Sequence, residues 1–185
     1  MTLNKPHLFL DLDETLFHSK TSDNTTFFVS KRPYLDEFLK FAFDNFRVSV
    51  WTASTTPYAV ETVKKYVLDG SPDRKLVYLL TRANCNESMK KYDEDIKNMQ
   101  YVIDASKNSN DSCLVVTKNN TIMIDDNIDV KNAQTKIGVE IINIPEFDNQ
   151  QNPSSTYDDN YLLQCIQTLK KFNKNFLEKS SQKLV

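Results

Sequence analysis

The sequence predicts an α/β fold in which a doubly wound, mostly parallel sheet carries helices on both faces. Short apolar runs alternate along the chain with segments of helical periodicity, an alternation typical of parallel sheets. Two of the apolar runs end in clustered acids, and open α/β sheets bind their ligands at the carboxyl ends of their strands. The chain has 185 residues, enough for a sizeable core, and we expect residues 1–185 to form one domain.

Five short apolar runs are candidates for the buried strands of this sheet. A continuous apolar run is expected where both faces of a parallel strand are covered. A further run at 27–29 suggests a short strand, and we interpret the polar stretch 18–26 before it as a turn. The five candidate strands span residues 8–10, 47–51, 76–80, 121–124 and 139–144.

Three segments between or after these runs have the spacing of amphipathic helices. One begins after Pro33 and another after Pro57, and proline is favoured at the first positions of a helix. The third spans 160–177, and we interpret its apolar stripe as core packing rather than as a binding face. Residues 178–185 are expected to form a flexible tail. The stripe consists of Leu162, Leu163, Ile166, Leu169, Phe172 and Phe176.

Residues 86–120 form the most polar part of the chain. They are rich in Lys, Asn, Asp and Ser, with small apolar islands at 99–103 and 114–116. We expect helical pieces and loops that elaborate the core, because the segment is too polar and too short to be an independent domain.

Composition excludes several kinds of function. A formal net charge of −2 gives no global reason to expect direct nucleic-acid binding. The only glycines are Gly70 and Gly138, so the chain has no glycine-rich phosphate loop. Any phosphate chemistry must therefore use another device.

Cysteine usage and hydropathy indicate the compartment. Cys85, Cys113 and Cys165 are far apart and form no CxxC motif, which favours free thiols in a reducing environment. The N-terminus has no apolar signal-peptide core, and no apolar run approaches the ~18 residues that cross a bilayer. We therefore expect an intracellular, soluble monomer of the nucleus or cytoplasm that contacts no membrane.

Acidic residues follow the first candidate strand directly. Asp11, Asp13 and Glu14 lie within four residues of one another in the stretch HLFLDLDETLFHS. Unpaired carboxylates at the end of a buried strand cost several kcal/mol, roughly, and a metal ion would remove that penalty. The alternative is a solvated loop in which Glu14 and Thr15 cap the start of a helix.

The candidate strand at 121–124 repeats this pattern. It ends in Asp125 and Asp126, more than a hundred residues after the first acidic cluster. Two strands that both end in paired carboxylates would be an odd coincidence for solvated loops. As a pair they suggest a site for a divalent cation.

The motifs around these acids resemble a known family. DLDETLFHS resembles the DxDx(T/V) signature of the haloacid dehalogenase superfamily, and it is most similar to the DLDETLVHS of phosphatases that act on the C-terminal domain of RNA polymerase II. Within that string only Phe17 differs. WTAS at 51–54 resembles the family's FTAS, and IMIDDN at 122–127 resembles its IIVDDS. The resemblance implies a Rossmann-like core with a small insert rather than a large cap.

The resemblance also implies roles for individual residues. Asp11 would be the nucleophile that forms an aspartyl-phosphate, and Asp13 the general acid and then the base. Thr52 would donate a hydrogen bond to the transferring phosphoryl group. Mg²⁺ would be held by Asp11, the backbone carbonyl of Asp13, Asp125 and Asp126.

One lysine is expected to neutralise the nucleophile and the phosphate. The family places it in a KDL string, and IKNM at 96–99 is the nearest likeness, which indicates Lys97. Ile96 and Met99 could anchor a short helix that fixes this lysine. Lys107 and Lys91 remain alternatives, although Lys107 lies in a polar stretch without such anchors. Arg32 belongs to a family-like RP motif, and we interpret it as a solvated cation rather than a substrate ligand.

Taken together, these features favour a Mg²⁺-dependent phosphoserine/phosphothreonine protein phosphatase, with phosphopeptides such as the RNA polymerase II tail as candidate substrates. One alternative is a phosphatase for a small metabolite or a nucleic-acid end on the same fold. Small-molecule members usually need a large lid, and this chain has only the 35 residues of 86–120 to build one. The other alternative is a non-catalytic binding module, against which the presence of both Asp11 and Asp13 argues.

Overall fold

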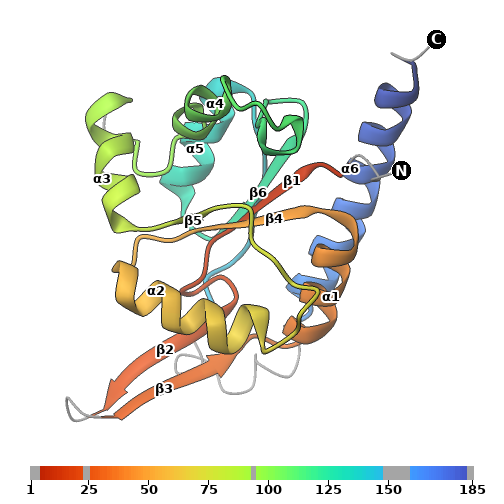
Figure 1. Ribbon diagram of the computed structural model, residues 1–185. Coiled ribbons are helices and arrows are strands. Elements are labelled where there is room, and N and C mark those ends of the chain that lie inside the picture. The colour runs from red at the N-terminus through yellow and green to blue at the C-terminus, as the bar shows by residue number, and fades with distance from the viewer. Residues whose placement is uncertain (1–4, 23–25, 93–94, 148–158, 183–185) are drawn as a thin grey trace.

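The computed structural model describes residues 5–22, 26–92, 95–147 and 159–182. Five parallel strands form a central sheet with helices on both faces, which confirms the predicted fold class (Figure 1). The sheet has the order β5-β4-β1-β6-β7, so the first strand lies in the middle. The strands are β1 (His7–Leu10), β4 (Arg47–Trp51), β5 (Leu79–Leu80), β6 (Thr121–Asp125) and β7 (Glu140–Asn143).

The register of the sheet places the functional loops side by side. Leu10 at the end of β1 pairs with Val50 of β4 on one side and with Ile124 of β6 on the other. The segments that follow these three strands therefore leave the sheet at neighbouring positions along one edge. β5 pairs with β4 only over its two residues, so it is shorter than the 76–80 run predicted.

Helices cover the two faces in two groups. One face carries α1 (Leu35–Asn45), α2 (Thr56–Thr62) with its π-helical continuation η1 (Val63–Leu68), and α6 (Tyr161–Gln182) (Figure 1). The other carries α3 (Arg82–Lys91), α4 (Gln100–Ser106), the 3₁₀ turn η2 (Ser112–Leu114) and α5 (Ile128–Ile137). None of the helices among the described residues has the length and apolarity that a bilayer crossing requires.

Alternate residues of β1 divide the core into two clusters. Leu8 and Leu10 pack with α1, η1 and α6, whereas Phe9 packs with Trp51 on the opposite face. The predicted stripe of α6 lies in the first cluster, where Leu162, Ile166, Leu169 and Phe172 are buried as expected for core packing. The second cluster contains Met99, Val102, Ile103 and Val116, so the segment 86–120 supplies much of one wall of the protein.

The region 17–31 confirms the short strand predicted at 27–29 but differs from the turn predicted before it. β2 (Phe17–Ser22) and β3 (Thr26–Lys31) form an antiparallel hairpin that projects from the body of the molecule (Figure 1). The interpretation of 18–26 as a turn was therefore wrong. The stretch 18–26 is mostly polar, so no apolar run marked β2, whereas the apolar run at 27–29 lies within β3.

The C-terminus differs as well. α6 continues to Gln182, so most of the predicted flexible tail is helical. Polar residues extend this helix beyond the buried stripe, because helical hydrogen bonding needs no apolar partner. Cys85, Cys113 and Cys165 are free, as predicted.

Candidate active site

The first acidic loop is fixed directly at the end of β1. Asp11 is only 6% exposed, and its main-chain N–H donates to the carbonyl of Ile124 at 3.0 Å. The Thr15 hydroxyl lies 3.1 Å from Asp11 Oδ2 and 2.8 Å from Asp126 Oδ1, and it accepts from the main-chain N–H of Asp126 at 3.2 Å. Thr15 thus joins the two acidic segments rather than capping a helix.

A single lysine bridges the two strand ends. The ammonium of Lys97 lies 2.6 Å from Asp11 Oδ1 and 2.7 Å from Asp125 Oδ2, and all three side chains are less than 10% exposed. Lys97 comes from the turn before α4, and Met99 anchors this turn in the second core cluster. Lys107 and Lys91 instead lie exposed beside Asp104. Of the three predicted lysines, the structure therefore brings only Lys97 to the acids.

Burial and charge set the protonation of this cluster. Burial raises the pKa of Asp11 to about 7; the Asp125 and Asp126 charges act in the same direction, whereas Lys97 opposes them. Burial also raises the pKa of Asp125. For Lys97 burial acts to lower the pKa, but the carboxylates of Asp11 and Asp125 outweigh it and raise the pKa, so the side chain stays cationic.

Asp13 lies in a different environment although it is only two residues from Asp11. Its carboxylate accepts hydrogen bonds from the hydroxyls of Ser54 (2.6 Å), Ser19 (3.3 Å) and Tyr58. Burial and the Asp13 charge both raise the pKa of Tyr58, which keeps its hydroxyl protonated as a donor. The two carboxylates of the DxD motif therefore differ in partners and in charge environment.

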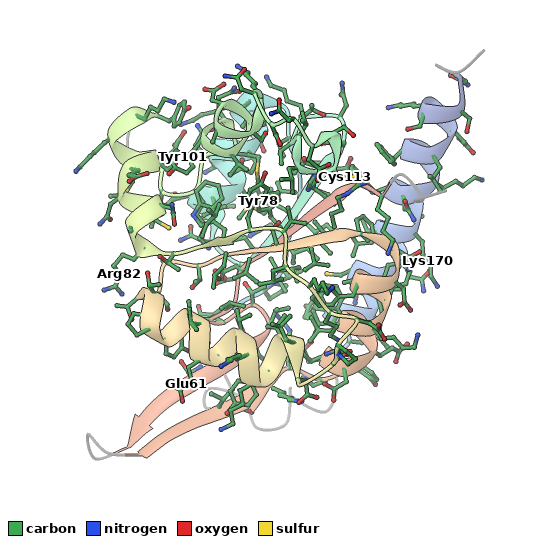
Figure 2. The ribbon with its side chains drawn as sticks, viewed as in Figure 1. Glu61, Tyr78, Arg82, Tyr101, Cys113 and Lys170 are labelled. Atoms are coloured by element: carbon green, nitrogen blue, oxygen red, sulfur yellow. The ribbon has the colours of Figure 1, made fainter. Side chains whose placement is uncertain are left out.

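Thr52 follows β4 and faces the same loop. Its hydroxyl is 3.5 Å from Asp13 Oδ2 and accepts from the main-chain N–H of Ser54 at 3.1 Å. Arg82 binds the next residue of this segment, because its Nε donates to the Ala53 carbonyl at 2.9 Å. Figure 2 shows Arg82 at the start of α3, beside the N-terminal end of α2. Thr52 thus lies beside Asp13, within reach of anything bound between the loops after β1 and β4.

Three carboxylates could hold a metal ion. Oxygens of Asp11, Asp125 and Asp126 all lie within 4.8 Å of one another. Carboxylate oxygens are the ligands that Mg²⁺ prefers, and Mg²⁺ keeps several waters, so this donor set fits it. The side chain of Asp13 is not part of the group, and ligation by its backbone carbonyl stays a prediction.

Arg32 is a correction to the sequence analysis. It is 2% exposed rather than solvated, and its Nε donates to both carboxylate oxygens of Asp159, at 3.2 and 2.9 Å. Its two Nη groups donate to the carbonyls of Thr15 and Pro145, and its guanidinium lies 5.4 Å from the Phe147 ring centroid. Arg32 therefore ties the first acidic loop to the start of α6.

Several site residues were not found from the sequence. Ser54 and Tyr58 lie two and six residues after Thr52, and only Tyr58 belongs to α2, so no regular spacing in the sequence joins them. Asn143 donates from its side-chain amide to the carbonyls of Asp125 and Asp126 at 3.0 and 2.8 Å. Asn143 is the last residue of β7, a different strand from those that carry the predicted acids, and no motif in the sequence marks it.

The comparison with known families is decisive once this geometry is in view. Residues 6–180 match the NLI interacting factor-like phosphatases. The chain belongs to this family. A CTD phosphatase-like protein (355R) of Invertebrate iridescent virus 3 is 30% identical over 148 residues, which cover 78% of this chain and 73% of the viral protein. Its namesake from Invertebrate iridescent virus 6 is 28% identical over 152 residues, covering 70% of this chain and 81% of that protein.

Solved structures support the fold. The structure of Fcp1, an essential RNA polymerase II CTD phosphatase, matches with a TM-score of 0.56 at 15% identity. A fission yeast Fcp1 variant bound to beryllium fluoride matches with a TM-score of 0.57 at 14% identity. Each match covers 98% of this chain, which spans 54% and 56% of the two Fcp1 chains, about half their length. At these identities the likeness concerns the fold alone.

Proposed function

We propose that this member of the family is a Mg²⁺-dependent phosphoserine/phosphothreonine protein phosphatase that acts through an aspartyl-phosphate. One observation carries the proposal. Asp11 is bound to Lys97 beside two further carboxylates, whereas Asp13, two residues away, is held by hydroxyl donors outside that cluster. Two carboxylates in contrasting environments can take two chemical roles.

In the first step an oxygen of Asp11 attacks the phosphorus of the phosphomonoester. The bond from phosphorus to the ester oxygen breaks, and Asp13 gives its proton to that oxygen, so the serine or threonine hydroxyl leaves as a neutral alcohol. Lys97 neutralises part of the negative charge that nucleophile and phosphate bring together. The hydroxyl of Thr52 donates to a phosphoryl oxygen.

In the second step water hydrolyses the aspartyl-phosphate. Asp13, now ionised, takes a proton from a water molecule while the oxygen of that water bonds to phosphorus. The bond between phosphorus and the Asp11 oxygen breaks, which releases inorganic phosphate and the free Asp11 carboxylate. The hydroxyls of Ser54 and Tyr58 hold Asp13 in place through both transfers. Mg²⁺ held by Asp11, Asp125 and Asp126 would stabilise the charge on the equatorial phosphoryl oxygens.

The substrate class follows from what surrounds these loops. The described residues place a two-stranded hairpin after the DxD loop and no folded lid domain over it, an arrangement suited to a side chain on an extended peptide. The names of the relatives, CTD phosphatase-like proteins and CTD phosphatases, point to phosphoproteins such as the RNA polymerase II tail as candidates. A small-metabolite phosphatase is the second candidate function.

Steady-state kinetics test both candidates. We expect kcat/KM to be higher for phosphoserine peptides, including proline-flanked ones, than for sugar phosphates or nucleotides, with all activity lost in EDTA and regained with Mg²⁺. Asp11→Asn should lose at least ~10³-fold in kcat because the covalent route is gone. Near wild-type turnover by Asp11→Asn would contradict the mechanism, and a clear preference for a metabolite would favour the second candidate.

A further inference from the structure

The turn that carries Lys97 is held by two buried polar side chains from different helices. It spans 95–99, between α3 and α4, and has no regular secondary structure to fix it. Ser88 of α3 lies on one side and Gln134 of α5 on the other, and neither has any exposed surface.

Gln134 binds two main-chain groups of the turn, at Lys97 and at Met99. Its side-chain carbonyl accepts from the main-chain N–H of Met99 at 3.0 Å, and its side-chain amide donates to the main-chain carbonyl of Lys97. The same amide lies 3.3 Å from the Val130 carbonyl in its own helix. A buried amide satisfied on both its oxygen and its nitrogen is fixed in one orientation, because breaking either bond leaves an unpaired buried group.

Ser88 completes the arrangement. Its hydroxyl donates to the Asp95 carbonyl at 2.8 Å and accepts from the Asn98 N–H at 3.0 Å. Four main-chain groups within the five-residue turn are therefore paired with two side chains. Since backbone groups of the turn are the partners, these bonds determine where the turn lies, whatever side chain it carries.

α5 links this arrangement to the acids. The helix begins at Ile128, two residues after Asp126, and Gln134 lies nearly two turns along it. One rigid element thus follows the carboxylates at its start and holds the lysine turn further on. The turn held in this way carries the Lys97 ammonium 2.7 Å from Asp125 Oδ2.

We propose that Gln134, with Ser88, is a positioning residue that sets the location of the Lys97 ammonium against Asp11 and Asp125. The inference rests on the function proposed above, since it assigns Gln134 and Ser88 to the support of that site. A lysine side chain has four rotatable bonds, so its charge is useful to the reaction only if its backbone is fixed. Displacement of a reacting group by about 1 Å can cost up to ~100-fold in rate.

Gln134→Met tests the proposal because it keeps the length of the side chain and removes both hydrogen bonds. We expect kcat on a phosphopeptide to fall by about 10- to 100-fold with KM changed much less. Ser88→Ala should act in the same direction. Ser106→Ala is the matched control: Ser106 is also buried and pairs with the main chain at Ile103 and Val116, but it does not touch the turn. It should lower the melting temperature comparably and leave kcat unchanged.

Gln134→Glu separates positioning from general stability. A buried carboxyl has a raised pKa, and in its neutral form it can donate to Lys97 and accept from Met99 as the amide does. Its kcat relative to wild type should be near one at low pH and fall as the carboxyl ionises, whereas Gln134→Met should be low throughout. Circular dichroism at each pH would show that the variants remain folded.

The outcomes are distinct. Full kcat in Gln134→Met would overturn the positioning role of Gln134 and leave the proposed function intact. Losses of kcat in Gln134→Met and Ser106→Ala that merely track their melting temperatures would do the same. Should Gln134→Met fail to fold, a flat pH ratio for Gln134→Glu overturns it instead. A wild-type protein without phosphatase activity would refute the proposed function itself.

Discussion

At the scale of single residues, Asp11 and Asp13 show how neighbours in sequence acquire different surroundings. The side chain of Asp11 enters the buried cluster around Lys97, whereas that of Asp13 meets hydroxyl groups from β2 and the segment after β4. Glu14, with φ of 61°, adopts the left-handed conformation that turns the chain immediately after Asp13.

Asp13→Asn tests the proton transfer that the proposed mechanism assigns to this residue. An asparagine keeps the size of the side chain but cannot transfer a proton to the leaving oxygen. We expect a phosphoserine peptide, whose alkoxide is strongly basic, to be hydrolysed far more slowly, and an aryl phosphate with an acidic leaving group to lose much less in its first step. Pre-steady-state release of the phenol would measure that step. Equal losses on both substrates would argue against the assigned role.

His7 illustrates a titratable residue outside the site. It is completely buried in β1, and neither ring nitrogen has a hydrogen-bond partner among the described residues. Burial, with a smaller contribution from the charge of Arg47, lowers its pKa from 6.5 to about 4. Between these two pH values the imidazole of His7 is therefore mostly neutral in the native state and mostly protonated in the unfolded chain.

The free energy of unfolding should consequently fall on acidification. Between pH 6.5 and 4 the unfolded state binds a proton at His7 that the native state does not. The free energy of unfolding therefore keeps its full His7 contribution above pH 6.5 and loses about 3 kcal/mol of it as the pH falls to 4. His7→Phe should lack this component. Urea unfolding followed by the fluorescence of Trp51, the only tryptophan, would measure the difference between variant and wild type at pH 7 and pH 4.5. A difference that does not vary with pH would contradict the assignment.

Three of the residues predicted from the sequence share one position in the fold, whereas Lys97 lies in a turn. Asp11, Thr52 and Asp125 each stand at the end of a buried strand, and a strand end is visible as a change from apolar to polar letters. Arg32 pairs with Asp159, 127 residues away, and such a contact leaves no local pattern. Its burial could therefore not be predicted without the fold.

At the scale of elements, α6 is an amphipathic helix whose burial decreases toward its C-terminal end. Leu169 has no exposed surface and packs in the first core cluster, whereas Leu177, two turns later on the same helix, is 38% exposed. The periodicity of the sequence identified the buried side correctly, but it could not say where the helix ends, because its last turns lie beyond the core.

Leu169→Ala should therefore destabilise the protein by about 2–5 kcal/mol, since it removes buried methylene groups and leaves a cavity. Leu177→Ala, the matched change on the same helix, should stay within about 0.5 kcal/mol of wild type. Chemical denaturation of the two variants would measure both. Similar losses at the two positions would mean that the C-terminal turns of α6 pack more closely than their exposure indicates.

At the scale of the whole molecule, we expect the carboxylate cluster to couple the proposed metal binding to stability. Without a bound metal ion, the carboxylates of Asp11, Asp125 and Asp126 repel one another, and the ammonium of Lys97 offsets only part of their negative charge. A ligand that binds only the native state stabilises it by about 2.7 kcal/mol at a hundred times its Kd. Mg²⁺ should therefore raise the melting temperature of the wild-type protein.

Asp126→Asn should weaken this stabilisation and raise the melting temperature of the metal-free protein, because it removes one of the repelling charges. Thermal denaturation with EDTA and with increasing Mg²⁺ measures both effects without any substrate. Ca²⁺ should support turnover poorly even where it binds, since its coordination is looser. An unchanged response of Asp126→Asn to Mg²⁺ would remove Asp126 from the metal site.

The central position of β1 has a consequence for how the chain can be made. Its partner β4 follows within about forty residues, but β6 begins only at Thr121, so one edge of this fully buried strand stays unpaired until Thr121 has been synthesised. An exposed apolar strand edge is a template for association with other chains. A nascent or truncated chain ending before Thr121 should therefore aggregate, or require a chaperone, with His7–Leu10 as the segment at risk.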